Sequence, residues 1–173
     1  KPALIGACGL AAFAVWSLAD AQNIARAADA SCAPILESMK KQLALPVFGA
    51  TSTLDDGPEK KFVYTQTDIF TATENGRWRK KLKSTEERDQ GQWLAKYSSQ
   101  LHACSTGVPD TLNGSVAKLY VAQLGTVLIR KWIGQADGLP MQQEATLPGT
   151  HKRVTVWNYN HVAVPASDTV DAE

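Results

Sequence analysis

The sequence predicts an α+β fold. The expected architecture is a strongly curved antiparallel sheet, an incomplete β-barrel of about seven or eight strands, with an N-terminal helix and a second helix covering one face. Two segments have helical periodicity, and several strand-length segments are rich in β-branched and aromatic residues. Turn-forming residues join these segments at short intervals, and such short connections favour antiparallel pairing.

The first helix is expected to begin after Asp29 and to end before Pro46, with Pro34 tolerated near its start. Apolar residues at spacings of three and four form one stripe along it: Cys32, Ile35, Leu36, Met39 and Leu43. This stripe is expected to pack on the sheet.

The second helix is predicted from a capping box, in which Ser84 is the N-cap and Glu87 follows three residues later. Its apolar side is formed by Trp93, Leu94, Tyr97 and Leu101. This helix is expected to cover the same sheet as the first.

The strands are placed between turn signals. Residues 49–61 carry turn formers without periodicity and are interpreted as a surface loop. The Asn75-Gly76 pair predicts a hairpin. The expected strands are 62–65, 69–73, 77–82, 116–123, 126–133, 139–146 and 153–162. We therefore expect one domain over residues 22–165 and a disordered tail over residues 166–173.

The N-terminal residues are typical of an export signal. Lys1 precedes an uncharged apolar run over residues 2–18, and Ala19-Asp20-Ala21 has the form of a cleavage site. This predicts a signal peptide over residues 1–21 and a periplasmic protein. Two alternatives are a retained anchor and a lipoprotein acylated at Cys8, because Ile5-Gly6-Ala7-Cys8 loosely matches a lipobox.

Removal of the signal leaves two cysteines, Cys32 and Cys104. In an oxidising compartment such a pair most simply forms a disulfide. Two separate buried thiols are the alternative. A metal site is not predicted, because neither cysteine has the ligand spacing that such a site needs.

The composition and motifs exclude several classes of function. The 173 residues are 44% hydrophobic and 20% charged, and the net charge of +1 gives no reason to expect a nucleic-acid partner. Catalytic and cofactor motifs are missing, and the three histidines, His102, His151 and His161, have no nucleophile pattern around them. We expect no enzymatic activity and no cofactor, and a hydrolase is kept as a remote third hypothesis.

A basic segment follows the predicted hairpin. Four cations alternate along one face of the expected strand: Arg77, Arg79, Lys81 and Lys83. They would suit an anionic membrane surface or an acidic envelope protein. The alternative is an edge strand whose charges oppose edge-to-edge pairing.

Several strands are apolar on both faces. In residues 126–133, Leu128 and Trp132 alternate with Val127, Ile129 and Ile133. A sheet covered by helices on one side needs only one apolar face. Either the other face is also covered, or the curved sheet encloses an apolar cavity.

Short motifs resemble the LolA-like lipoprotein-carrier superfamily. They are Gly76-Arg77-Trp78, Trp132-Ile133 before Asp137-Gly138-Leu139-Pro140, and the closing segment from Trp157 to Pro165. The resemblance covers roughly residues 30–165. It implies a half-barrel closed by helices, with a concave interior that receives acyl chains, and it implies structural or lining positions for Trp78, Trp132, Leu139 and Tyr159.

Together, these features predict an exported, non-enzymatic protein that holds a lipid-like or other apolar ligand. The expected ligand-binding residues are Trp78, Trp93, Tyr120, Leu128, Trp132, Leu139, Trp157 and Tyr159. The alternative is an envelope interaction module, in which the core is filled by side chains and the basic segment binds an acidic partner.

Overall fold

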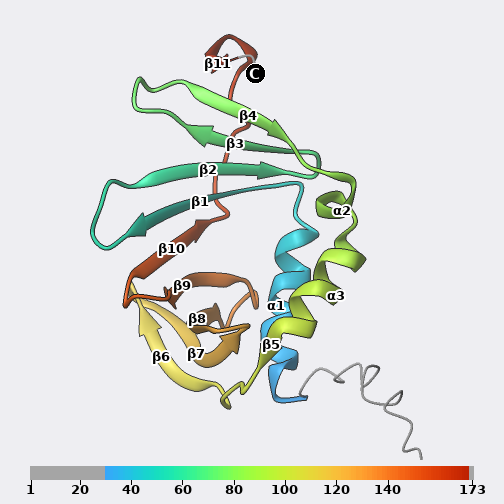
Figure 1. Ribbon diagram of the computed structural model, residues 1–173, viewed down its shortest axis with the longest axis vertical. Coiled ribbons are helices and arrows are strands. Elements are labelled where there is room, and N and C mark those ends of the chain that lie inside the picture. The colour runs from blue at the N-terminus through green and yellow to red at the C-terminus, as the bar shows by residue number, and fades with distance from the viewer. Residues whose placement is uncertain (1–29, 172–173) are drawn as a thin grey trace, which may run out of the picture.

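The computed structural model describes residues 30–171, which form eleven strands and five short or medium helices (Figure 1). The helices are η1 (Ala30–Cys32), α1 (Ala33–Leu43), α2 (Thr85–Arg88), α3 (Gln90–Gln100) and η2 (Ser167–Thr169). The strands are β1 (Val47–Leu54), β2 (Lys60–Thr65), β3 (Asp68–Ala72), β4 (Trp78–Leu82), β5 (Leu101–His102), β6 (Val108–Leu112), β7 (Ser115–Leu124), β8 (Val127–Gly134), β9 (Pro140–Thr146), β10 (Lys152–Asn158) and β11 (Val170–Asp171).

All strands belong to one open sheet, ordered β11-β4-β3-β2-β1-β10-β9-β8-β7-β5, and β6 pairs with β7 beside this path. Every pairing is antiparallel except that of β11 with β4. The predicted α+β class and the open antiparallel sheet are confirmed. The expected number of strands is too low.

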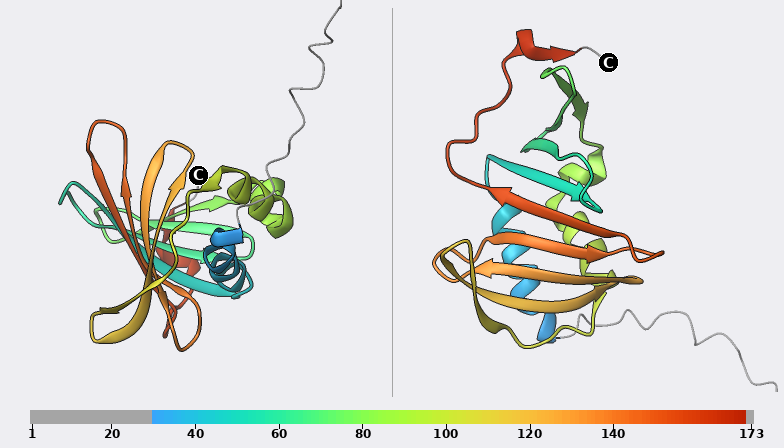
Figure 2. Two further views of the ribbon diagram at one scale, coloured as in Figure 1. Left: turned by 90° about the horizontal axis from the view of Figure 1, so that it is seen from below. Right: turned by 90° about the vertical axis from the view of Figure 1, so that its left-hand side faces the viewer.

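The helices α1 and α3 lie on the same side of the sheet, which curls partly around them (Figure 2). We call this side of the sheet the inner face and the opposite side the outer face. Of the predicted apolar stripe, Cys32, Ile35 and Met39 are buried, and Leu36 and Leu43 are half-buried. The polar Ser38 and Gln42 are buried beside them. The capping box at Ser84 is also confirmed, but α2 stops at Asp89, whose carboxylate caps α3 instead.

The main apolar core lies between the first turns of α1 and strands β7, β8 and β9. Ile35 packs there with Tyr120, Ile129 and Ala145. The predicted disulfide joins Cys32 to Cys104 with a Cα–Cα distance of 5.2 Å, so the start of α1 is linked covalently to the segment that follows β5. The disulfide prediction is therefore confirmed.

The interpretation of residues 49–61 as a loop is wrong. Strand β1 occupies the middle of the sheet, between β2 and β10. The segment after β10 passes beside β1: a Cβ on Gly49 would lie 3.6 Å from the side chain of Val162, an ordinary van der Waals distance. Strand β6 was also missed, because Pro109 lies in it and the tight turn at Asn113-Gly114 follows it.

The C-terminal segment differs from the expected disordered tail over residues 166–173. It crosses the outer face of the sheet and forms η2 and β11 (Figure 2). Val170 pairs with Trp78 of β4 in parallel, so β4 is not a free edge strand at this end.

The predicted signal peptide over residues 1–21 and its Cys8 lie outside the described residues. Among residues 30–171, the helices are too short or too polar to cross a membrane.

Candidate functional site

A mostly apolar cavity of about 200 Å³ lies between the two main helices and the inner face of the sheet. It is open to solvent on one side, and it collects side chains from α1, α3 and strands far apart in the sequence. Its apolar and aromatic lining is Met39, Leu43, Phe48, Tyr64, Ile69, Trp93 and Trp157.

The register of the strands explains why these side chains meet. Phe48 of β1 lies directly opposite Tyr64 of β2, which lies opposite Ile69 of β3, so all three share the inner face. The Phe48 and Tyr64 rings stack with centroids 4.9 Å apart. On the helix side, Met39 and Leu43 are one turn apart on α1.

The polar residues of the cavity lining are Lys83 and Glu87 at the rim and the buried Gln42, and all three are already paired. Lys83 donates from Nζ to the Thr65 carbonyl at 2.6 Å, and desolvation lowers the pKa of its amine. Glu87 accepts from the Ser84 N–H, which lowers the pKa of its carboxyl. Gln42 donates to the Tyr159 hydroxyl at 2.9 Å. The rim is therefore held in place by contacts within the protein.

Lys131 of β8 is the most unusual residue near the cavity. It is 1% exposed, and its Nζ lies 2.8 Å from the Met39 sulfur. The amine also lies 5.0 Å from the centroid of the Trp157 ring and 5.8 Å from that of Tyr97. Burial lowers its pKa to about 7.

Of the expected ligand-binding residues, Trp93 and Trp157 line the cavity. Tyr120 is on the inner face but belongs to the core under the first half of α1. Tyr159 lies beside the cavity, where its hydroxyl donates to the Pro140 carbonyl at 2.5 Å and its ring is 6.3 Å from that of Phe48. Through the Gln42 and Pro140 hydrogen bonds, Tyr159 links α1 to the start of β9.

The remaining four expected residues lie elsewhere. Trp132 is on the outer face, where its indole N–H donates to Asp110 at 2.7 Å. Leu128 shares that face and is 44% exposed. Trp78 is also on the outer face, since it pairs with Ala72 and Val170, and Leu139 lies in the β8–β9 turn. The alternation of apolar residues could not show which face of each strand the helices would cover.

Several cavity residues were not among the predicted site residues. Met39 and Leu43 were assigned only to the helix stripe, and Phe48 precedes a segment interpreted as a loop. Lys131 had one available signal: it stands between Ile129 and Ile133, on what becomes the buried face of β8.

The basic segment is not a uniform cationic surface. Lys81 lies 3.5 Å from Glu87, Lys83 is bonded to Thr65, and the Arg77 guanidinium donates to the Val170 carbonyl at 3.5 Å. Arg79 is exposed and lines a groove of about 730 Å³ together with Lys60, Lys61 and Trp78.

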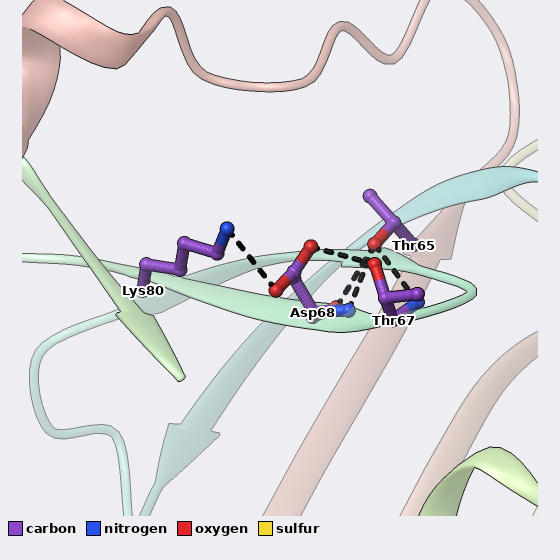
Figure 3. Close-up of polar contacts among 4 residues, drawn as sticks. All are labelled: Thr65, Thr67, Asp68 and Lys80. Atoms are coloured by element: carbon purple, nitrogen blue, oxygen red, sulfur yellow. Dashed lines mark hydrogen bonds and ion pairs between the residues drawn. The ribbon is translucent and has the colours of Figure 1, made fainter. Parts of the chain in front are cut away.

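On the other face of the same strand, Lys80 points toward Asp68, 3.3 Å from its carboxylate (Figure 3). Thr65 and Thr67 bond to Asp68 in the β2–β3 turn. This cluster fastens the turn to β4, so Lys80 has a structural partner.

The other polar groups of the structure offer fewer possibilities for binding or catalysis than the cavity does. A groove of about 720 Å³ between the β8–β9 turn and the end of β10 has a mixed lining with Asn158, Asn160 and Asp137. His102 contacts Gln100 and Gln123, and His151 contacts Asp55. Within residues 30–171, no three His, Cys, Asp or Glu side chains are grouped to hold a metal ion.

Comparison with solved structures finds the same architecture. The lipoprotein LppX of Mycobacterium tuberculosis matches with a TM-score of 0.53 and 12% identity, covering 78% of this chain and 97% of that chain. LprF of Mycobacterium bovis matches with a TM-score of 0.51 and 11% identity, covering 79% and 96%. The chain shares the fold of these two proteins. At these identities the likeness establishes the fold alone.

A LolA superfamily protein from Nitrosomonas europaea also matches, at a TM-score of 0.31 and 9% identity over 74% of this chain and 91% of that chain. No protein-family model and no curated protein sequence matches the chain.

Proposed function

We propose that this protein is an exported, non-enzymatic protein that binds an acyl chain or another apolar ligand between its helices and the inner face of its sheet. The observation that carries the proposal is the cavity lined by Phe48, Tyr64, Trp93 and Trp157, because apolar clefts with a few polar groups at the rim are the usual form of a small-molecule site.

The energetics favour a ligand with a chain. Each methylene group removed from water contributes about 0.8 kcal/mol, so a chain of about a dozen carbons suffices for useful affinity. The cavity, at about 200 Å³, is smaller than the roughly 300 Å³ at which ligand pockets usually begin. Binding therefore needs side chains to move, and Met39 is suited to this because methionine is flexible and unbranched.

Export is supported by the disulfide, because disulfides persist in oxidising compartments. It is also supported by the signal-like residues 1–21 and by the fold shared with LppX, which is named as a lipoprotein. The place we propose is the periplasm, either as a cleaved protein or, in the alternative, as a lipoprotein acylated at Cys8.

The test is binding of a fluorescent fatty acid, together with native mass spectrometry of protein purified from the cell envelope. Ile69→Trp fills the cavity and is expected to weaken binding about tenfold or more. Leu82→Trp is the matched control, since Leu82 is on the outer face and 61% exposed. If wild-type protein carries no lipid and binds no fatty acid, the proposal is wrong.

A second candidate is contact with an anionic membrane surface through the groove lined by Lys60, Lys61 and Arg79, with Trp78 beside them. It predicts sedimentation with phosphatidylglycerol vesicles that decreases with salt and is lost in Lys60→Glu/Arg79→Glu. The exposed Lys40→Glu on α1 is the control. Equal sedimentation of all three proteins would exclude this contact.

A further inference from the structure

The amine of Lys131 is buried without an acidic partner. Its hydrogen-bond acceptor is the Met39 thioether, which is a weak one, and the Tyr97 and Trp157 rings lie close to it. Desolvation is the only cause acting on its pKa, and no carboxylate among residues 30–171 forms an ion pair with it.

The neighbours of Lys131 on the inner face do not supply a charge either. Tyr120 lies opposite it on β7, and Gln143 lies opposite it on β9. From the helices, Met39 of α1 and Tyr97 of α3 approach the amine. A buried amino group normally has charged or hydrogen-bonding partners, so a further partner for this one is to be expected.

The amine lies one side chain behind the cavity. Met39 and Trp157 contact Nζ, and both also line the cavity wall. A rotation of the Met39 side chain would therefore open a path from the apolar cavity to a cationic donor. The acyl chain of a ligand would then lie in the apolar cavity, and its negatively charged end would lie beside the amine of Lys131.

We propose that Lys131 binds the carboxylate of a single-chain fatty acid, which takes the place of the Met39 sulfur while the acyl chain occupies the cavity. This inference rests on the proposed function and specifies its ligand class. A carboxylate fits better than a phosphate, because one amine compensates the desolvation of a single charge more completely than that of a doubly charged group. The small volume of the cavity favours the same choice.

The test compares dodecanoic acid with its methyl ester, which has the same chain and no charge. Both compete against a fluorescent probe at pH 7. Wild-type protein is expected to bind the acid about tenfold more tightly or better, since a charge-assisted hydrogen bond contributes on that order. Lys131→Met is expected to lose this preference and to keep the affinity for the ester.

Lys118→Met is the matched control, because Lys118 is an exposed lysine of β7 outside the lining of this cavity. It should leave the preference for the acid unchanged. Lys83→Met tests the other lysine of the cavity, whose amine is bonded to Thr65. If instead Lys83→Met abolishes the preference and Lys131→Met does not, the anchor is at the rim and our assignment is wrong.

A measurement on the wild-type chain covers the case in which Lys131→Met does not fold. The acid should raise the pKa of the Lys131 amine, followed by NMR of its ε-methylene group, and the ester should leave it unchanged. If both ligands bind equally and neither shifts this titration, Lys131 is not the anchor although the cavity binds lipid. If neither ligand binds, the proposed function itself fails.

Discussion

Replacing Lys131 by methionine is expected to stabilise the protein at neutral pH. Methionine is similar in length, is apolar and would sit against the Met39 thioether and the Trp157 ring in place of the amine. Replacing even a buried ion pair by apolar groups of similar volume is often neutral or stabilising by about 1 to 4 kcal/mol, and Lys131 has no ion-pair partner to lose.

The size of the destabilisation that Lys131 causes follows from the pKa of its amine, which burial lowers from 10.5 to about 7. At about 1.4 kcal/mol per pKa unit, protonated Lys131 disfavours the native state by roughly 5 kcal/mol, an upper bound. Above pH 7 the native amine loses its proton while the unfolded one keeps it, so the unfolded state binds more protons. The free energy of unfolding must then rise with pH, by about 2 kcal/mol between pH 7 and pH 9.

The assay is urea unfolding at pH 7, 8 and 9 with the disulfide intact. Wild type should gain stability across this range, and Lys131→Met should show a smaller gain. The upper limit of pH 9 avoids Tyr97, whose pKa burial raises to about 12. In Lys83→Met, the free energy of unfolding should still rise with pH, because Lys131 is still present. Equal slopes in wild type and Lys131→Met, or a methionine variant that is less stable at pH 7, would refute the reasoning.

Three further outcomes are expected. Replacing Cys32 and Cys104 together by serine should lower the free energy of unfolding by about 4 kcal/mol, because the disulfide spans 72 residues, and urea unfolding measures this loss. Ser84→Ala should cost about 1 kcal/mol in the same assay, because it removes the cap of α2. Asp110→Asn should reduce the loss of stability on acidification below about pH 4, measured by thermal unfolding, since the Trp132 hydrogen bond lowers the pKa of that carboxyl.

The controls and contrary results are specific to each change. Ser99→Ala on α3 is the control for the cap, because Ser99 bonds only within its own helix. Equal losses for the two serine variants would contradict the capping role. If removing the disulfide lowers the free energy of unfolding by less than about 1 kcal/mol, the loop-closure account is contradicted. If Asp110→Asn loses as much stability below about pH 4 as wild type does, the hydrogen bond between Trp132 and the Asp110 carboxylate does not stabilise the native state.

The elements that could be predicted from sequence are those with local causes. The stripe on α1 and the capping box at Ser84 depend on residues within one helix turn, and the Asn75-Gly76 hairpin depends on a tight turn between β3 and β4. The disulfide was predictable because only one pairing of the two remaining cysteines is possible.

The elements that were missed have causes distant in the sequence. Strand β1 consists largely of small and hydroxyl residues, and it is a strand because β2 and β10 pair with it on both sides. Similarly, β11 forms only because residues 159–169 cross the outer face and bring Val170 beside Trp78. Residue propensities within a short window of sequence cannot reveal strand partners that are distant in the sequence.

The candidate site was predicted only in small part, for a related reason. Alternation separates Ile129, Lys131 and Ile133 from Leu128 and Trp132, but it does not say which set faces the helices. Had the first set been chosen, Lys131 would have stood out as a charge in the middle of the buried face. The expected residues were large apolar side chains chosen without assigning a face, so the outer-face residues Leu128 and Trp132 were grouped with the cavity residue Trp157. A lone lysine flanked by aliphatic residues on one parity of a strand therefore indicates the helix-covered face better here than the largest side chain does, because it lies on the same parity as the core residues Ile129 and Ile133.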